Sequence, residues 1–302
     1  MDCKRCDQGA YQQRDIILIS LILAVISSSA IALLWKIAES KKYSTYRIIQ
    51  FNYLSATLLS LFFFRHQIVQ WKGNLPSITL LAFIFGLIFV GSFFLYATNI
   101  ANNGAILASS VAKMGILLPV FLSFLIFREP LSHRQSLGLI LGCMSLILYF
   151  GYSAFFSTKS TRVNRSALLL LFFLFISQGL AEMSGKLFEF FFDPSLRSLY
   201  LGLLFFTSFL VTSYYIVIKK LTIRGNKEIR FGLLLGIPNF FSSYFLIDAF
   251  TTLKSAIVFA LFGIGTILTV SLVSIILFKE KITKLQVLFL FAIFITIWLI
   301  QS

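Results

Sequence analysis

The stretch Pro76–Tyr96 reads PSITLLAFIFGLIFVGSFFLY and contains no Asp, Glu, Lys or Arg. A helix needs about 20 mainly apolar residues to cross the hydrocarbon core of a bilayer, so this run predicts a membrane-spanning helix. The whole chain agrees, because 58% of its 302 residues are hydrophobic and only 12% are charged. A soluble domain requires more polar surface than this composition supplies. The sequence therefore predicts an integral membrane protein.

Ten such runs follow one another along the chain and predict an all-α polytopic fold. Five of them fill residues 15–154, after an N-terminal tail of residues 1–14, and five more fill residues 166–302. Residues 155–165 form a polar linker between the two groups. We predict transmembrane helices at residues 15–35, 44–64, 76–96, 105–127, 134–154, 166–190, 196–218, 228–248, 253–278 and 283–300.

Polar residues indicate that the second group of helices repeats the first. The motif FREPLS at residues 127–132 recurs as FKEKIT at residues 278–283, and SFFL from Ser92 recurs as SYFL from Ser243. Such matches are informative because matches among Leu, Ile and Phe are common in membrane proteins. Five helices is an odd number, so the second unit must enter the membrane from the opposite side. The sequence thus predicts two inverted five-helix repeats, an architecture of secondary transporters.

The formal net charge of +15 does not indicate a nucleic-acid partner. The basic residues lie in short clusters between the apolar runs, where Lys and Arg set the orientation of a membrane protein. More of them fall on the side opposite to the two termini than on the side of the termini. Taken alone, this bias predicts that both termini lie outside the cytoplasm.

Lys113 is the most informative single residue, because it falls near the middle of the predicted helix 105–127. An unpaired lysine at that depth costs about 3 kcal/mol on insertion scales. We expect Lys113 to bind a negative group of the substrate, such as a carboxylate or a phosphate. The alternatives are a structural counter-ion for a buried carboxylate such as Glu182, or a lysine that snorkels toward the membrane interface.

Glu182 is the candidate for coupling transport to protons, because burial favours the protonated form of a carboxyl group. Lys186 lies one turn further along the same predicted helix and Glu189 lies beyond it, so Lys186 can pair with either carboxylate. A structural ion pair between Glu182 and Lys186 is therefore an open alternative. Lys36 and Glu39 occupy the related place in the first repeat.

Gln178 and Asn52 are amides inside predicted helices, and each can hydrogen-bond a solute or a neighbouring helix. Pro119 and Pro238 also lie inside predicted helices, where a proline removes a backbone hydrogen bond and leaves a carbonyl group available for water or ligand. We expect kinks at both prolines, with cavity-lining segments as one interpretation and helix packing as the other.

Other chemistries find little support in the sequence. His66 and His133 lie at span ends, and Cys3 and Cys6 form an isolated C-K-R-C, so we predict no metal site and no catalytic residue. The chain has no phosphate-binding G-x-x-x-x-G-K-[ST] loop, and we expect no cofactor. A channel or facilitative pore is the main alternative to a carrier, followed by an intramembrane enzyme.

The end of the first repeat resembles a known family. Small residues from Ala108 to Ala112, then Pro119, then FREPL from Phe127, are similar to the pattern that closes each five-helix unit of EamA-type transporters, the ten-helix branch of the drug/metabolite transporter superfamily. The second repeat departs from this pattern, since Val270 stands at the place of Pro119. The resemblance implies a secondary transporter, often an exporter of amino acids, nucleotide-linked metabolites or drugs, with both termini cytoplasmic.

We therefore predict a secondary active transporter that moves a small anionic or zwitterionic metabolite, such as an amino acid or a nucleotide-type metabolite, by alternating access. We expect it in a bacterial inner (plasma) membrane. Its expected partners are the small-molecule substrate, membrane lipid and, as the coupling ion, protons.

Overall fold

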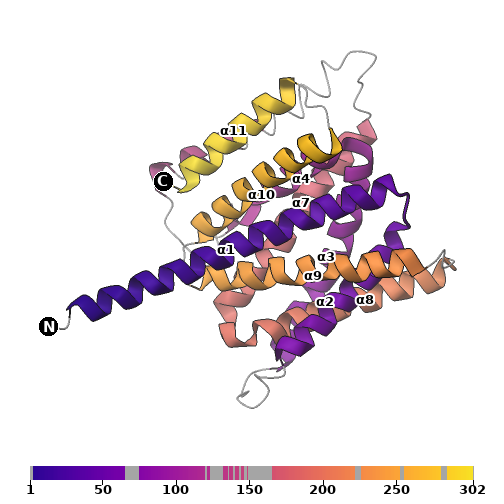
Figure 1. The fold of residues 1–302 in the computed structure, drawn as a ribbon, viewed down its shortest axis with the longest axis horizontal. Helices are drawn as coiled ribbons and strands as arrows, with labels where there is room; N and C mark the ends of the chain where they lie inside the picture. The colour runs from indigo at the N-terminus through magenta and orange to yellow at the C-terminus, as the bar shows by residue number, and fades with distance from the viewer. Residues whose placement is uncertain are drawn as a thin grey trace.

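The computed structural model describes residues 3–64, 75–119, 121–122, 165–221, 226–251, 255–279 and 284–301, with scattered residues from 132 to 148. All regular structure in these residues is helical. A short 3-10 turn, η2 (Pro194–Leu196), precedes α8. The helices, shown in Figure 1, are α1 (Cys3–Ser40), α2 (Thr45–Phe64), α3 (Leu75–Asn103), α4 (Ala105–Met114), α7 (Arg165–Phe191), α8 (Arg197–Ile218), α9 (Asn226–Phe250), α10 (Ser255–Phe278) and α11 (Lys284–Gln301).

Seven helical stretches in the described part of the chain are long and apolar enough to cross a bilayer. Two shorter helical stretches, Ala105–Pro119 and Val287–Thr296, are also apolar. Large apolar side chains such as Leu58, Leu80 and Leu169 are exposed on these helices, as a lipid-facing surface requires. The seven stretches are Ile19–Ser40, Thr45–Phe64, Leu75–Asn103, Ser166–Phe191, Pro194–Ile218, Asn226–Phe250 and Leu261–Phe278.

The helix boundaries differ from the prediction at several places. α1 begins at Cys3, so the expected tail of residues 1–14 is helical from Cys3 onward, and in Figure 1 this end of α1 projects beyond the other helices. The predicted helix 134–154 is described only in short helical runs. The predicted linker 155–165 lies outside the described residues, except for Arg165, where α7 begins.

The predicted helix 105–127 is interrupted after Met114. Residues 115 and 116 form a turn, and helical backbone resumes at Leu117. Pro119 explains the interruption, because it lacks the N–H group that would bond the carbonyl oxygen of Gly115, four residues earlier. That oxygen accepts from the Leu118 N–H instead, at 2.9 Å, which tightens the backbone locally. The turn at residues 115 and 116 lies one helical turn before Pro119, and the kink at this proline stays a prediction.

The core forms where helices from distant parts of the chain meet. α2 packs against both α8 and α9, α1 packs against α9 and α10, and α7 packs against α3 and α4. Two glycines of α9 bring its backbone close to α2, since a Cβ atom added at Gly236 would lie 2.4 Å from the carbonyl oxygen of Asn52. Between α2 and α8 the rings of Tyr53 and Phe205 stack with their centroids 6.1 Å apart. This packing leaves a cavity between α1, α3, α4, α7 and α9.

Candidate functional site

The cavity has a volume of about 80 Å³ and polar side chains on several sides. One wall, from α4 and α7, carries Lys113, Gln178 and Glu182. A second wall, from α1, α3 and α9, carries hydroxyl and amide groups and three aromatic rings. The side chains of this second wall include Ser28, Phe89, Ser92, Phe93, Tyr96, Asn239, Ser242 and Ser243.

An ion pair defines the charged wall. The Nζ atom of Lys113 donates to Oε1 of Glu182 at 2.8 Å, and the two side chains are only 11% and 14% exposed. Nζ also lies 3.8 Å from the centroid of the Phe262 ring on α10, where the ring face attracts the cation. The Glu182 carboxylate and the Phe262 ring face offset the desolvation cost of the buried Lys113 ammonium group. Both residues of the ion pair also line the cavity, where a small solute can reach them.

Two ion pairs involve the charged side chains of α7, and one of them has the spacing that the sequence favours. Lys186 donates to Glu189 at 2.9 Å, while Glu182 pairs with Lys113 of another helix. A separate Glu182–Lys186 ion pair is thus replaced by two pairs that share no residue. In the first half of the chain, Lys36 and Glu39 form a similar pair at 3.4 Å.

Two glycines fix the distance between Lys113 and Glu182. A Cβ atom added at Gly179 would lie 2.6 Å from the carbonyl oxygen of Gly115, and one added at Gly115 would lie 2.7 Å from the backbone nitrogen of Gly179. The backbones of α7 and of the turn after α4 are therefore in direct contact at this crossing. Lys113 lies two residues before Gly115, and Glu182 lies three residues after Gly179. The close crossing brings these two side chains within hydrogen-bonding distance.

The structure brings three of the predicted site residues together and separates the others from them. Lys113, Gln178 and Glu182 line the cavity, whereas Asn52, Lys186, Pro119 and Pro238 are not among its lining residues. Asn52 is fully buried in α2, and neither polar atom of its side chain has a hydrogen-bond partner among the described residues. Asn239, the residue after Pro238, does line the cavity.

Sequence reasoning missed the neutral polar wall. Ser92 and Ser243 both line the cavity, and they are equivalent positions of the repeated motif that begins SFFL in α3 and SYFL in α9. The predicted repeat therefore contained a signal for these serines, because the two matching sequence motifs each begin with a hydroxyl residue. Asn239 gave no such signal, since its partner position in the first repeat is not an amide.

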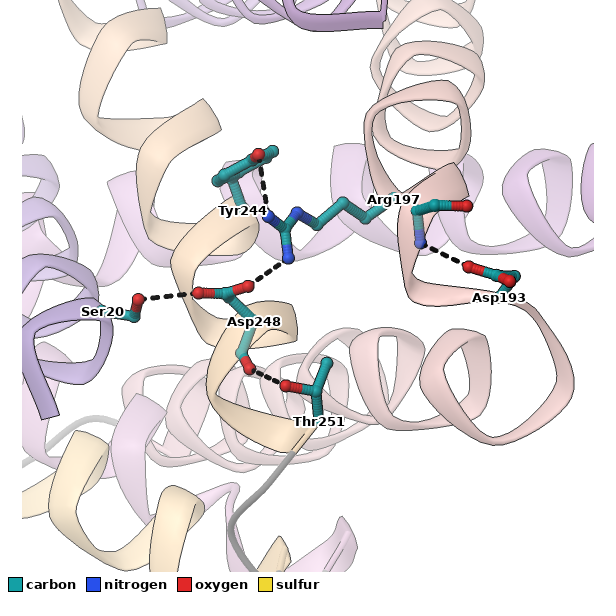
Figure 2. A network of polar contacts seen from close by, with 7 residues as sticks. Ser20, Asp193, Arg197, Tyr244, Asp248 and Thr251 are labelled. Atoms are coloured by element: carbon teal, nitrogen blue, oxygen red, sulfur yellow. Dashed lines mark hydrogen bonds and ion pairs between the residues drawn. The ribbon is translucent and has the colours of Figure 1, made fainter. Parts of the chain in front are cut away.

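A second polar network lies at one end of the bundle (Figure 2). The guanidinium of Arg197, at the start of α8, bonds the carboxylate of Asp248 and donates to the Tyr244 hydroxyl at 2.9 Å. The other carboxylate oxygen of Asp248 accepts from Ser20 of α1 at 2.7 Å. The network therefore ties α8 and α9 to α1, and Asp248 lies two residues beyond Leu246, which lines the cavity.

Asp193 is the N-cap residue of the 3-10 turn η2, which precedes α8. Its carboxylate accepts from the Ser195 N–H at 2.7 Å. Hydrogen bonds from the side chain and backbone of Ser195 hold the pKa of the exposed Asp193 carboxyl below its ordinary value. This contact caps η2 and orients the chain that leads into Arg197.

Known proteins are similar to this chain over most of its length. An uncharacterized protein of Haemophilus influenzae is 26% identical over 288 residues, which cover 88% of this chain and 92% of that protein. A solved crystal structure at 13% identity covers 91% of this chain and 94% of its own chain with a TM-score of 0.61, so it shares the fold. A family model of EamA-like transporters matches residues 15–151, which confirms the resemblance in the first repeat. Over these residues, this chain of apolar membrane helices is similar to the EamA-like transporter family.

Proposed function

We propose that the protein is a secondary active transporter that moves a small anionic or zwitterionic metabolite across a bacterial inner membrane by alternating access. The observation that carries this proposal is the Lys113–Glu182 ion pair, which faces a cavity between helices from both halves of the chain. Each charge of the pair offers a site for the opposite charge of a solute. The cavity of about 80 Å³ favours a small solute over a drug-sized one, since drug pockets usually hold about 300–1,000 Å³.

Alternating access requires two similar units that can rock against each other, and we propose ten helices in two inverted five-helix repeats. The helix packing supports this arrangement. α1 packs against α9 and α10, the third and fourth helices of the proposed second unit, and α7 packs against α3 and α4, the third and fourth of the first. α2 packs against α8, the second helix of the other unit. Each of these helices therefore packs against the same positions of the other unit as its equivalent helix does.

Inverted units place equivalent loops on opposite sides of the membrane. We expect a membrane-impermeant thiol reagent to label Lys41→Cys, after the first helix of one unit, from one side of oriented vesicles. The same reagent should label Asp193→Cys, after the first helix of the other unit, only from the opposite side. Both substitutions are made in a protein whose native Cys3, Cys6 and Cys143 are replaced by serine. Labelling of both positions from the same side would contradict the inverted arrangement.

Transport by a carrier is expected to show exchange and a response to protons. In proteoliposomes, uptake of radiolabelled L-threonine, L-aspartate or adenosine monophosphate is measured against the same unlabelled solute inside. We expect at least one of them to be stimulated by the internal solute, because a carrier returns faster when loaded. An imposed pH gradient should change the rate, and Glu182→Gln should lose this change, since an amide cannot exchange a proton.

A channel gives the opposite result in the same experiment, because its flux is not stimulated by solute on the far side. Absence of exchange for all three solutes would contradict the carrier proposal. An unchanged pH response in a transporting Glu182→Gln protein would remove Glu182 from the coupling step alone.

A further inference from the structure

The neutral wall of the cavity contains two buried donors that no acceptor among the described residues engages. The Ser92 side chain on α3 and the Asn239 side chain on α9 belong to residues that are only 1% and 3% exposed. Neither the Ser92 Oγ atom nor the Asn239 Nδ2 atom has a hydrogen-bond partner within the described part of the chain. Buried donors without an acceptor are destabilising, so most buried polar groups in native proteins are paired. Both residues line the cavity, so a bound solute can supply the missing acceptor.

These donors come from different helices than the charged pair does. Lys113 and Glu182 belong to α4 and α7, whereas Ser92 and Asn239 belong to α3 and α9. The rest of the lining includes the ring of Phe93, which packs against Tyr53 with centroids 5.6 Å apart. A solute in the cavity is thus presented with a charged site, an aromatic surface and a separate neutral site.

We propose that Ser92 and Asn239 form a neutral subsite that binds an uncharged oxygen of the substrate, a hydroxyl or a carboxamide carbonyl. The inference rests on the proposed transport function and names the substrate class more closely. The transported solute carries its charge at Lys113 and Glu182 and a hydrogen-bonding group at its other end. Solutes of the same shape with an apolar group in that place are rejected, because they leave both donors unpaired.

Two pairs of probes of similar shape test this subsite. L-threonine and L-valine differ by a hydroxyl in place of a methyl group, and L-asparagine and L-leucine differ by a carboxamide in place of an isopropyl group. Dissociation constants are measured with the purified full chain in lipid nanodiscs. We expect L-threonine or L-asparagine to bind at least about tenfold more tightly than its apolar counterpart, since a buried donor distinguishes a hydrogen-bonding group from its isostere.

Substitution of the two donors should remove this preference without removing the site. In Asn239→Leu, which keeps the branched shape of the side chain but removes its polar atoms, the affinity for the polar probe should fall to that of its apolar counterpart. The affinity for the apolar probe should change less than about twofold, which also shows that the protein is folded. Ser92→Ala should have a smaller effect of the same direction. Ser60→Ala is the matched control, because the Ser60 hydroxyl is equally buried but donates to the Ala56 carbonyl of its own helix, away from the cavity.

Several results would overturn the subsite, and they separate it from the proposed function. Equal affinity for both members of each pair means that water alone occupies the two donors, and the charged site can still carry transport. Loss of the preference in Asn52→Leu but not in Asn239→Leu places the neutral subsite at the other buried amide. Absence of binding for all four probes, while L-aspartate or adenosine monophosphate is exchanged, overturns the subsite alone. Absence of both binding and exchange overturns the proposed function as well.

Discussion

Lys113→Ala is expected to abolish substrate binding and to destabilise the protein by about 3 kcal/mol, because it leaves the Glu182 carboxylate without its cation in a buried place. Glu182→Gln in the same chain should restore most of the melting temperature, since the uncompensated charge is then gone. It should not restore binding, because the cation that receives the anionic group is still missing. Lys113→Arg should keep part of the affinity, since the charge survives while its geometry changes. Melting temperature and probe affinity are measured for all four proteins.

A matched pair outside the cavity provides the control. Lys36 and Glu39 also form an ion pair, but their side chains are 21% and 37% exposed and lie on α1 outside the cavity lining. Lys36→Ala should change neither the melting temperature nor the affinity by a large amount. Wild-type affinity in the Lys113→Ala/Glu182→Gln protein would show that Lys113 is only a counter-ion for Glu182.

Gly179→Ala is expected to destabilise the protein by about 3 kcal/mol and to weaken substrate binding, although it adds a single methyl group. The new Cβ atom would lie 2.6 Å from the Gly115 carbonyl oxygen and 2.8 Å from the Leu118 Cβ atom, so the two backbones must separate. Separation lengthens the distance between Lys113 and Glu182, which lie beside this crossing. The measurements are the melting temperature and the affinity for the probe that the wild-type protein exchanges.

Gly91→Ala is the matched control, because it adds the same methyl group to a helix where nothing lies within 4 Å of the new atom. It should leave the melting temperature unchanged or slightly raised, since alanine favours the helix. Gly115→Ala should act like Gly179→Ala, and the double variant should be less destabilised than the sum of the two, because both act at one contact. Equal stability of the Gly179→Ala and Gly91→Ala proteins would contradict the close crossing.

The sequence predicted the features that follow from the lipid environment and from charged residues inside apolar segments. Apolar runs of the right length predicted membrane helices, and a lone lysine at membrane depth predicted that Lys113 needs a partner or a cavity. The sequence did not decide whether Lys186 or Lys113 pairs with Glu182. The i, i+4 spacing describes contacts within one helix and carries no information about neighbouring helices.

Features that depend on how two helices cross were not accessible. Gly115 and Gly179 are ordinary glycines in the sequence, and only their mutual contact makes each of them necessary. Asn52 and Asn239 are both amides in apolar helices, yet only Asn239 faces the cavity. The rotation of a helix about its axis decides between them, and a helix with apolar residues on all sides encodes that rotation weakly.

The Lys113–Glu182 pair also constrains how the protein is made. The two residues are 69 positions apart. At about 5–20 residues per second, the ribosome adds Glu182 about 3–14 s after Lys113. Throughout that interval the nascent chain contains a membrane segment whose lysine lacks its Glu182 partner, and an unpaired lysine at membrane depth costs about 3 kcal/mol on insertion scales. Segment 105–119 is therefore expected to enter the bilayer fully only when α7 emerges, so that the first half of the chain completes its insertion with the help of the second.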